Sequence, residues 1–293
     1  MQAREVGVVE VGVVSGFDGL LDDAALFPPG NAPMADAVPA HREYRAAWYD
    51  RLVGPFLVAV PRWSELRARL GASGVLDLGL IAPADRLVEP LAQALAEPRV
   101  ALTAVEVAPS ELPPRQAIGV LDELVPDRVT VAVEVPRGSL RPAFLDALAG
   151  TRYRAKLRTG GTVAEAFPGE AELGLAIADC RDRALPFKCT AGLHHAVRHT
   201  AADTGFEHHG YLNILLAAEA AARGAPAAEL AELLAERAEV TVVGAVAALP
   251  AQRLRAAREL FGSFGTCSIA EPVEDLVTLG LLSPPTPPLE SVR

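Results

Sequence analysis

Two lysines stand out among the residues that could do chemistry. Of the 27 basic residues only Lys156 and Lys188 are lysines, and each lies in a short apolar stretch that leads into a glycine turn. Lysine, unlike arginine, loses its proton readily when it is buried. A desolvated lysine beside a second cation has a lowered pKa, and its neutral amine can form a Schiff base with a carbonyl compound. We therefore predict that Lys156 is a nucleophile whose pKa is lowered by Lys188, with Arg158 nearby.

Two glutamates allow a second interpretation of these lysines. Glu106 and Glu134 lie near the ends of two valine-rich runs earlier in the chain. Each lysine could be the buried ion-pair partner of one of them, with no chemical role. In the catalytic interpretation, Glu106 or a histidine moves protons and Glu134 contacts the substrate. The sequence leaves both interpretations open.

Glycine turns follow the lysines and indicate where an anionic group would bind. Backbone N–H groups in such turns can hold phosphate or carboxylate, and so can an arginine side chain. The segment 261–268 is a further turn of this kind. The residues that we predict to contact the substrate are Asp22, Glu134, Arg158, Gly160, Gly161, Gly192, Ser263 and Ser268.

The histidines are clustered, since five of the six fall between positions 194 and 209. His194 and His195 directly follow a predicted strand, and we predict an acid/base role for them. His195 and His199 have the i, i+4 spacing of one helix face, which is also a zinc-ligand spacing. A divalent metal such as zinc, held by His195, His199, His208 and His209, is therefore one alternative. Hydrogen bonding within the loop is another.

Valine-rich runs alternate with helical patterns along the chain. The runs are continuous rather than alternately apolar and polar, which is typical of strands covered on both faces. About eight strand–helix units in roughly 250 residues predict a (β/α)8 barrel, with an open doubly wound sheet as the alternative. The predicted strands cover residues 20–27, 55–60, 75–81, 100–107, 128–135, 153–157 and 185–189, followed by either 240–246 or 261–268. The predicted helices cover residues 64–70, 88–95, 114–124, 140–148, 170–183 and 211–223.

The active site of such a barrel lies at the carboxyl ends of its strands, where most of the candidate residues fall. Residues 200–260 exceed the length of one unit, which predicts extra helices inserted between the seventh and eighth strands. The segment 200–211 is expected to fold over the site as a lid. No linker divides the chain, so we predict one domain over residues 1–282 and a proline-rich tail over 283–293. The apolar segment 6–14 predicts a short extra strand or edge segment.

The composition excludes several classes of function. Hydrophobic residues make up 51% of the chain and charged residues 22%, which is typical of a folded protein with a large core. A formal net charge of −10 argues against a general nucleic-acid binder. Three cysteines without a CxxC pair favour a reducing cytoplasm. We expect no membrane-spanning segment and no membrane partner.

The segment 155–195 resembles the class I deoxyribose-phosphate aldolases. Those barrels carry a Lys-Thr-x-Thr-Gly strand whose lysine forms the Schiff base, and a next strand whose lysine, in a Lys-x-x-Gly-Gly-like turn, tunes the first. The corresponding segments here are Lys156-Leu-Arg-Thr-Gly160 and Phe187-Lys-Cys-Thr-Ala-Gly192. The resemblance implies a barrel with Lys156 as nucleophile, Lys188 as its modulator and Glu106 in place of an acidic proton relay.

These patterns together predict a Schiff-base-forming aldolase or lyase. Its substrate would be a small carbonyl compound with a phosphate or carboxylate group, and it would need no organic cofactor because the imine serves as the electron sink. The alternatives are a metal-dependent barrel hydrolase or lyase that uses the histidine cluster, and a non-catalytic barrel that binds a small anion. Whether the chain forms a homo-oligomer is left open by the sequence.

Overall fold

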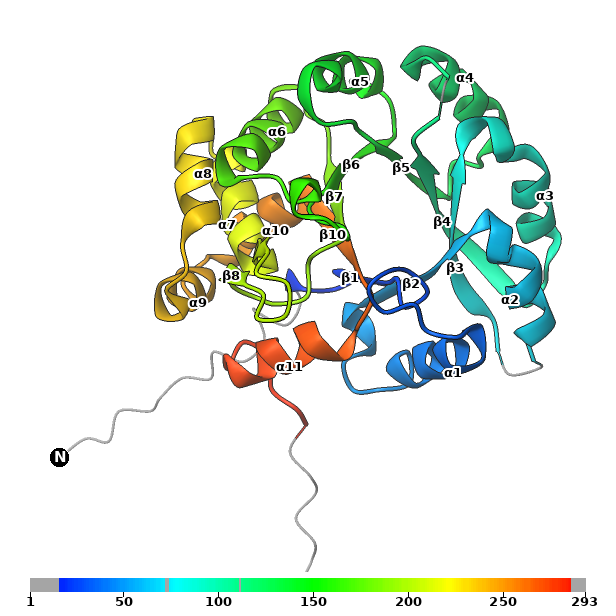
Figure 1. The fold of residues 1–293 in the computed structure, drawn as a ribbon, viewed down its shortest axis with the longest axis horizontal. Coiled ribbons are helices and arrows are strands. Elements are labelled where there is room, and N and C mark those ends of the chain that lie inside the picture. The colour runs from blue at the N-terminus through cyan, green and yellow to red at the C-terminus, as the bar shows by residue number, and fades with distance from the viewer. Residues whose placement is uncertain (1–15, 72–73, 111, 286–293) are drawn as a thin grey trace, which may run out of the picture.

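The computed structural model describes residues 16–71, 74–110 and 112–285 and shows a closed barrel of parallel strands (Figure 1). Around the barrel the strands follow the order β1-β10-β7-β6-β5-β4-β3-β2, and β2 closes onto β1. The predicted (β/α)8 barrel in a single domain is therefore confirmed. The eight barrel strands are β1 (Leu21–Asp23), β2 (Val53–Ala59), β3 (Leu76–Pro83), β4 (Val100–Ala108), β5 (Thr130–Glu134), β6 (Arg154–Arg158), β7 (Phe187–Thr190) and β10 (Phe261–Thr266).

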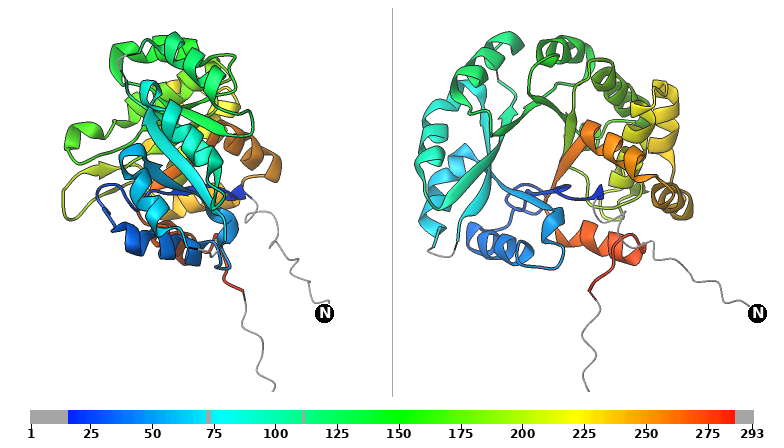
Figure 2. Two further views of the ribbon diagram at one scale, coloured as in Figure 1. Left: turned by 90° about the vertical axis from the view of Figure 1, so that its right-hand side faces the viewer. Right: turned by 180° about the vertical axis from the view of Figure 1, so that it is seen from behind.

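Helices surround the barrel on its outer side (Figure 2). Their apolar faces cover the outward-pointing strand residues, such as Val105 and Val107 of β4, which are 0% and 2% exposed. The residue between them, Glu106, points into the barrel, because neighbouring side chains of a strand point to opposite faces. The α-helices are α1 (Met34–Tyr44), α2 (Trp63–Arg69), α3 (Val88–Ala96), α4 (Pro114–Leu124), α5 (Arg141–Leu148), α6 (Glu170–Asp182), α7 (Tyr211–Ala222), α8 (Ala227–Ala235), α9 (Glu239–Ala247), α10 (Ala251–Leu260) and α11 (Ala270–Thr278).

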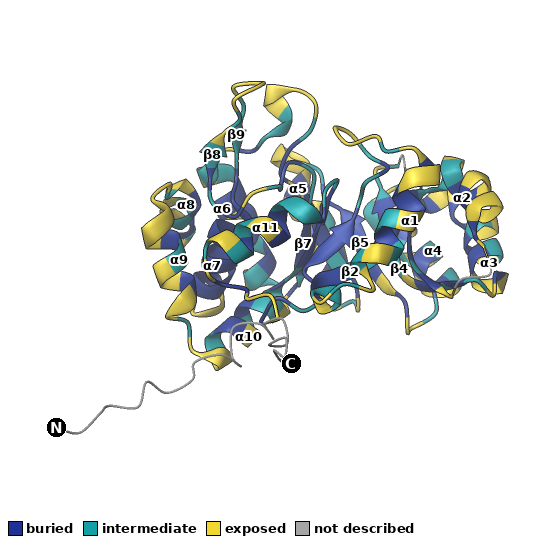
Figure 3. Cartoon of the chain, turned by 90° about the horizontal axis from the view of Figure 1, so that it is seen from below, coloured by how far each residue is buried: buried dark blue, intermediate teal, exposed yellow. Residues whose placement is uncertain are grey.

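The insertion predicted between the seventh and eighth strands is confirmed. The chain between β7 and β10 forms an antiparallel hairpin of β8 (His199–Thr200) and β9 (Glu207–His208), and then the helices α7 to α10. Figure 3 shows this hairpin projecting from one end of the barrel. α7 is buried along almost its whole length and forms the centre of the inserted region.

The alternative eighth strand at residues 240–246 is wrong, because this segment lies in helix α9. Val242 and Val246 are both 1% exposed, whereas Val240 is 82% exposed. A four-residue spacing of buried side chains is that of a helix face. The place next to β1 is taken by β10, whose Phe264 stacks on Tyr211 of α7 with 5.2 Å between ring centroids.

Two predictions concern the ends of the chain. The short strand or edge segment at 6–14 and most of the tail at 283–293 lie outside the described residues. Leu281 and Leu282 are buried, whereas positions 283–285 are exposed. In the described part of the chain, each helix is too short or too polar to cross a bilayer.

Asn213 of α7 links three parts of the insertion and provides a test of this architecture. Its side chain is fully buried, accepts a hydrogen bond from the Arg198 backbone N–H at 2.9 Å, and donates to the carbonyls of Leu233 and Glu236 at 2.9 and 2.8 Å. Asn213→Ala leaves these backbone groups unpaired, so we expect the free energy of unfolding to fall by about 2–4 kcal/mol in urea titrations. The control Gln252→Ala, on an exposed position of α10, is expected to change it by less than about 0.5 kcal/mol. Equal effects of the two substitutions would contradict this role of Asn213.

Candidate active site

Three hollows lie along the axis of the barrel. The upper cavity, at the carboxyl ends of the strands, has a volume of about 340 Å³, and Lys156, Arg158 and His194 are among its lining residues. The outer chamber, about 670 Å³, lies beyond it and shares Gly161, Gly192, His194 and Cys267 with it. The lower cavity, about 220 Å³, lies at the amino ends of the strands and is lined by Asp22, Lys188 and Ser263, among others.

Lys156 faces the upper cavity from the middle of β6. Its side chain is 4% exposed, and its Nζ lies 2.9 Å from Glu106 Oε2 and 2.9 Å from Glu134 Oε2. Arg158, two residues further along the same strand, points to the same side. Its Nε donates to Glu134 Oε1 at 2.9 Å, while 42% of its side chain stays exposed at the mouth of the cavity.

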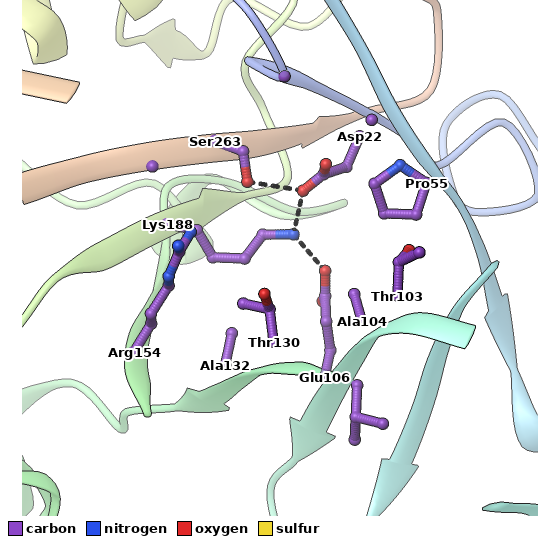
Figure 4. Close-up of a pocket in the computed structure, with 14 residues that line it drawn as sticks. Asp22, Pro55, Thr103, Ala104, Glu106, Thr130, Ala132, Arg154, Lys188 and Ser263 are labelled. Carbon is purple, nitrogen blue, oxygen red and sulfur yellow. Dashed lines mark hydrogen bonds and ion pairs between the residues drawn. The ribbon is translucent and has the colours of Figure 1, made fainter. Parts of the chain in front are cut away.

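Lys188 is the register partner of Lys156 on β7, as expected for neighbouring strands, but it faces the lower cavity. Its Nζ donates to Asp22 Oδ2 at 2.5 Å and to Glu106 Oε1 (Figure 4). Ser263 Oγ donates to the same Asp22 oxygen at 2.7 Å. The ion pairs that the sequence suggested for the lysines are therefore present, and Asp22 is an additional partner.

These contacts join six charged side chains into one series, which we call the charge line. From the amino end of the barrel to its mouth, negative and positive groups alternate and each touches the next. Buried charges are tolerated only when they are paired and hydrogen-bonded, and here three carboxylates balance three cations. The charge line consists of Asp22, Lys188, Glu106, Lys156, Glu134 and Arg158.

The pKa values along the charge line reflect burial and the charges of the neighbours. Burial by itself raises the pKa of Glu106, but the charges and hydrogen bonds of Lys156 and Lys188 outweigh it and lower that pKa to about 2. Burial opposes the charged form of Lys188, but Asp22 and Glu106 together raise its pKa. Burial also raises the pKa of Asp22, and the nearby Glu106 adds to this rise, although Lys188 opposes it. Asp22 is thus the carboxylate of the lower cavity that holds a proton most readily.

The ammonium groups of the two lysines are separated by a carboxylate. Glu106 lies between Lys156 and Lys188 and uses one carboxylate oxygen for each. The reason is electrostatic, because two adjacent cations in a buried site would repel each other, whereas an intervening carboxylate stabilises both. The lysines are neighbours on adjacent strands, as predicted, and the influence of Lys188 on the pKa of Lys156 stays a prediction.

The glycine turns after β6 and β7 pack against each other beside the upper cavity. A Cβ atom on Gly160 would lie 2.7 Å from Gly192 Cα, and Gly192 has a φ of +73°, so both positions need glycine. Thr159 Oγ1 donates to the Ala191 carbonyl at 2.6 Å and ties the two turns together. Gly161 and Gly192 line the upper cavity, and their contact with a substrate stays a prediction.

The two predicted serines face different hollows of the barrel. Ser263 is near the start of β10 and faces the lower cavity, where its hydroxyl donates a hydrogen bond to Asp22. Ser263 and Asp22, both predicted to contact the substrate, therefore do not border the upper cavity. Ser268 borders the outer chamber, and its Oγ accepts from the Glu271 backbone N–H at 3.3 Å. The structure therefore brings Ser268 to the same chamber as Gly161 and Gly192, whereas Ser263 lies at the other end of the barrel.

Four histidines border the outer chamber, but not on a helix. His195 lies in a loop and His199 in β8, which corrects the predicted helix face. The hairpin pairs His199 with His208, and the ring centroids of these two lie 5.1 Å apart, while that of His195 lies 4.8 Å from His199. Burial lowers the pKa values of His199 and His208. The predicted lid segment 200–211 overlaps this hairpin, which borders the outer chamber, and its closing over the site stays a prediction.

His209 is separate from the other histidines. It is fully buried, its Nε2 lies 2.8 Å from the Pro168 carbonyl and its Nδ1 lies 3.2 Å from Arg198 Nη1. Burial lowers its pKa to about 4. Within residues 16–71, 74–110 and 112–285, no three His, Cys, Asp or Glu side chains are grouped as a metal ion would require. The predicted four-histidine ligand set is thus not assembled.

His194 lies where the upper cavity meets the outer chamber. Its Nδ1 is 2.9 Å from Glu271 Oε2, and the Cys267 sulfur lies 3.8 Å from the same nitrogen. Glu271 belongs to α11, 77 residues further along the chain, and sequence reasoning missed it because nothing in its local pattern distinguishes it from a surface glutamate of a helix. His195 instead pairs with Asp275, at 3.2 Å, and borders only the outer chamber of these hollows.

The fold and the charge line define a (β/α)8 barrel with a buried lysine–carboxylate centre. Comparisons of the chain with protein-family models, with curated proteins and with solved structures found no match. The family resemblance therefore has no support beyond the local motifs and the barrel itself.

Glu106 provides a test of the charge line by its effect on stability. Its pKa in the folded protein, about 2, lies below the ordinary 4.5, so it stabilises the fold above pH 4.5 and this contribution is lost as the pH falls toward 2. We expect Glu106→Gln to lower the free energy of unfolding at pH 7 by about 3 kcal/mol and to flatten its dependence on pH between 4.5 and 2. Urea unfolding across this range measures both effects.

The control is Glu65→Gln, which removes a carboxylate from an exposed pair with Arg62. No measurable loss of stability is expected for it, because solvent screens exposed pairs. A Glu106→Gln protein as stable as the unmodified protein at pH 7 would show that the charge line does not stabilise the barrel.

Proposed function

We propose that the chain is a lyase of the aldolase type, which forms a Schiff base between Lys156 and a small carbonyl substrate that bears an anionic group. The observation that carries the proposal is the placement of Lys156. Of the two lysines, it alone borders the upper cavity, at the barrel end where such folds hold their active sites. Its Nζ touches two carboxylates that can accept protons.

The amine of Lys156 becomes a nucleophile once it has given a proton to a carboxylate. Glu134 is the acceptor on the substrate side, because it borders the upper cavity and lies 2.9 Å from Lys156 Nζ. Glu134 also forms an ion pair with Arg158. When a substrate anion binds Arg158 in place of Glu134, the Glu134 carboxylate loses this partner and can accept the proton from Lys156. The neutral amine then adds to the carbonyl carbon, water leaves, and the imine accepts the electron pair of the bond that breaks.

His194 supports the proton transfers at the far side of the cavity. Its Nδ1 is held by Glu271, which fixes the orientation of the ring at the border of the two hollows. A histidine in this position can exchange a proton with a hydroxyl or carbonyl oxygen of the substrate. Glu271 is then a positioning residue, in the same way that carboxylates orient other catalytic histidines.

The non-catalytic alternative shares part of this geometry. A barrel that only binds an anion would use the same Arg158 and the same glycine turns, but it would not need a buried lysine that faces the cavity. The metal-dependent alternative lacks a grouped set of ligands among the described residues. Trapping of the imine separates the proposal from both.

Imine formation can be detected and assigned to a residue, because the chain contains only two lysines. After incubation with a panel of small aldehydes, ketones and 2-oxo acids and reduction with borohydride, we expect an adduct on Lys156, detected by intact mass and located by peptide mapping. Lys156→Arg keeps the charge but cannot form an imine, and is expected to abolish this adduct. Lys188→Arg is the matched control and is expected to retain it.

Two outcomes would oppose the proposal. An adduct that disappears only in Lys188→Arg would place the nucleophile in the lower cavity. A protein that forms no lysine adduct with any carbonyl compound, yet is stabilised by phosphate or a carboxylate, would favour the non-catalytic alternative.

Arg158 tests the anionic part of the substrate. We expect Arg158→Gln to weaken the apparent affinity for carbonyl compounds with a phosphate or carboxylate by about 10- to 100-fold, because a charged hydrogen bond is lost. Imine formation with an uncharged carbonyl compound should be largely retained, which the rate of borohydride trapping measures. Arg62→Gln, on a half-buried arginine that pairs with Glu65, is the control. If Arg158→Gln weakens the apparent affinity for charged and uncharged carbonyl compounds equally, Arg158 does not recognise the anion.

A further inference from the structure

The lower cavity lies at the end of the barrel opposite to the upper cavity, and charged side chains border it. Figure 4 shows Lys188, Asp22, Glu106 and Ser263 meeting in it. Its volume of about 220 Å³ is sufficient for several water molecules, each of which occupies about 30 Å³ in the liquid. Because charged side chains border this cavity and it is large enough, we expect it to hold water.

Small residues create the space in the lower cavity. A Cβ atom on Gly54 would lie 2.2 Å from Asp22 Oδ1, and one on Gly262 would lie 2.5 Å from an Arg154 guanidinium nitrogen. Ala104 and Ala132 border the same cavity. Larger side chains at these positions would close the space that leads to Asp22 and Lys188.

The lower cavity opens to solvent. Gly19, Thr103 and Thr130 border it and are exposed, whereas Asp22 and Lys188 at its inner end are each 5% exposed. Water in the cavity therefore reaches the buried end of the charge line without passing through the upper cavity.

We propose that the lower cavity is a proton port, through which Lys188 and Asp22 exchange protons with solvent while Glu106 relays protons between Lys188 and Lys156. The relay deepens the proposed function, on which its last step at Lys156 rests. A substrate seated in the upper cavity excludes water there, and imine chemistry still has to release and take up protons. Through the lower cavity, at the other end of the barrel, these protons can pass to and from solvent.

The proton balance of the relay is simple. Lys156 gives a proton to Glu106, whose carboxyl turns and passes it to Lys188 as Lys188 gives its own proton to Asp22. Asp22 then gives this proton to water in the lower cavity. One proton leaves Lys156 Nζ, one appears on cavity water, and no other bond changes. The raised pKa of Asp22, caused by burial, suits it to hold the proton between these two transfers.

The test uses the fact that the chain has two lysines. Labelling with [15Nζ]lysine gives one NMR signal for Lys156 and one for Lys188, and the exchange of their Nζ hydrogens with water can be followed separately. Thr130→Ile narrows the lower cavity and keeps a β-branched residue on its strand. Thr162→Ile makes the same change at the upper cavity, which Thr162 borders, and is the matched control.

We expect Thr130→Ile to slow hydrogen exchange at Lys188 several-fold, and Thr162→Ile to leave it unchanged. Ala104→Val narrows the same lower cavity from β4 and is expected to slow exchange at Lys188 in the same way. This second variant keeps the test decisive if Thr130→Ile does not fold. Unchanged exchange at Lys188 in both narrowed proteins, or equal slowing by Thr162→Ile, would overturn the proton port.

A second measurement separates this inference from the proposed function. In the protein whose Lys156 carries a reduced adduct, the upper cavity is filled, and exchange at Lys188 is expected to continue at its earlier rate. If the adduct strongly slows hydrogen exchange at Lys188, water reaches Lys188 through the upper cavity, and the proton port is overturned. If Lys156 forms no adduct at all, the proposed function fails, whereas the comparison of Thr130→Ile with Thr162→Ile still decides whether the port exists.

Discussion

The alternation of charge inside the barrel is the constraint on which the rest of the structure depends. Five of the six charged side chains are buried, and none of the five could be buried singly, because each would lose its hydration without compensation. Arranged as carboxylate, ammonium, carboxylate, ammonium, carboxylate and guanidinium, they neutralise one another in sequence. The barrel suits this arrangement, because its strands bring inward-facing residues from distant parts of the chain within reach of one another. Glu106 occupies a central place, since it pairs with both lysines through its two oxygens.

The charge line also divides the interior into two ends with different surroundings. Toward the mouth, Lys156 and Arg158 face a cavity that is bordered by glycine turns and adjoins the outer chamber, which histidines of the hairpin border. Toward the amino ends, Lys188 and Asp22 face a hollow kept open by small residues. A barrel whose lower end is filled by bulky apolar side chains would isolate a buried lysine from solvent once substrate is bound. Here the charge line borders the upper cavity at one end and the lower cavity at the other.

The insertion between β7 and β10 gives the mouth its shape. α7 is buried between the barrel and the added helices, and Asn213 at its start holds the loop before the hairpin and the helices after it. The hairpin then stands over the carboxyl ends of the strands (Figure 3) and places His199 and His208 above the turns after β6 and β7. α11 contributes Glu271 from the other side and orients His194. The histidine cluster of the sequence thus becomes a rim around the site.

The sequence by itself favoured the barrel over an open sheet, predicted the positions of most strands and the extra helices before β10, and singled out the two lysines and Glu106, which the structure joins by ion pairs. These features follow from local rules, namely the period of apolar residues, the length of strand–helix units and the burial of strands on both faces. At residues 240–246 the valine run fits both a strand and a helix, and only packing against neighbouring elements selected the helix. Tertiary structure alone decided that Lys188 and Asp22 face the lower cavity, that Ser263 joins them there, and that Glu271 reaches His194. The direction in which a long buried side chain turns is set by its charged partners, and for Lys188 these lie 166 and 82 residues away. No local pattern carries that information.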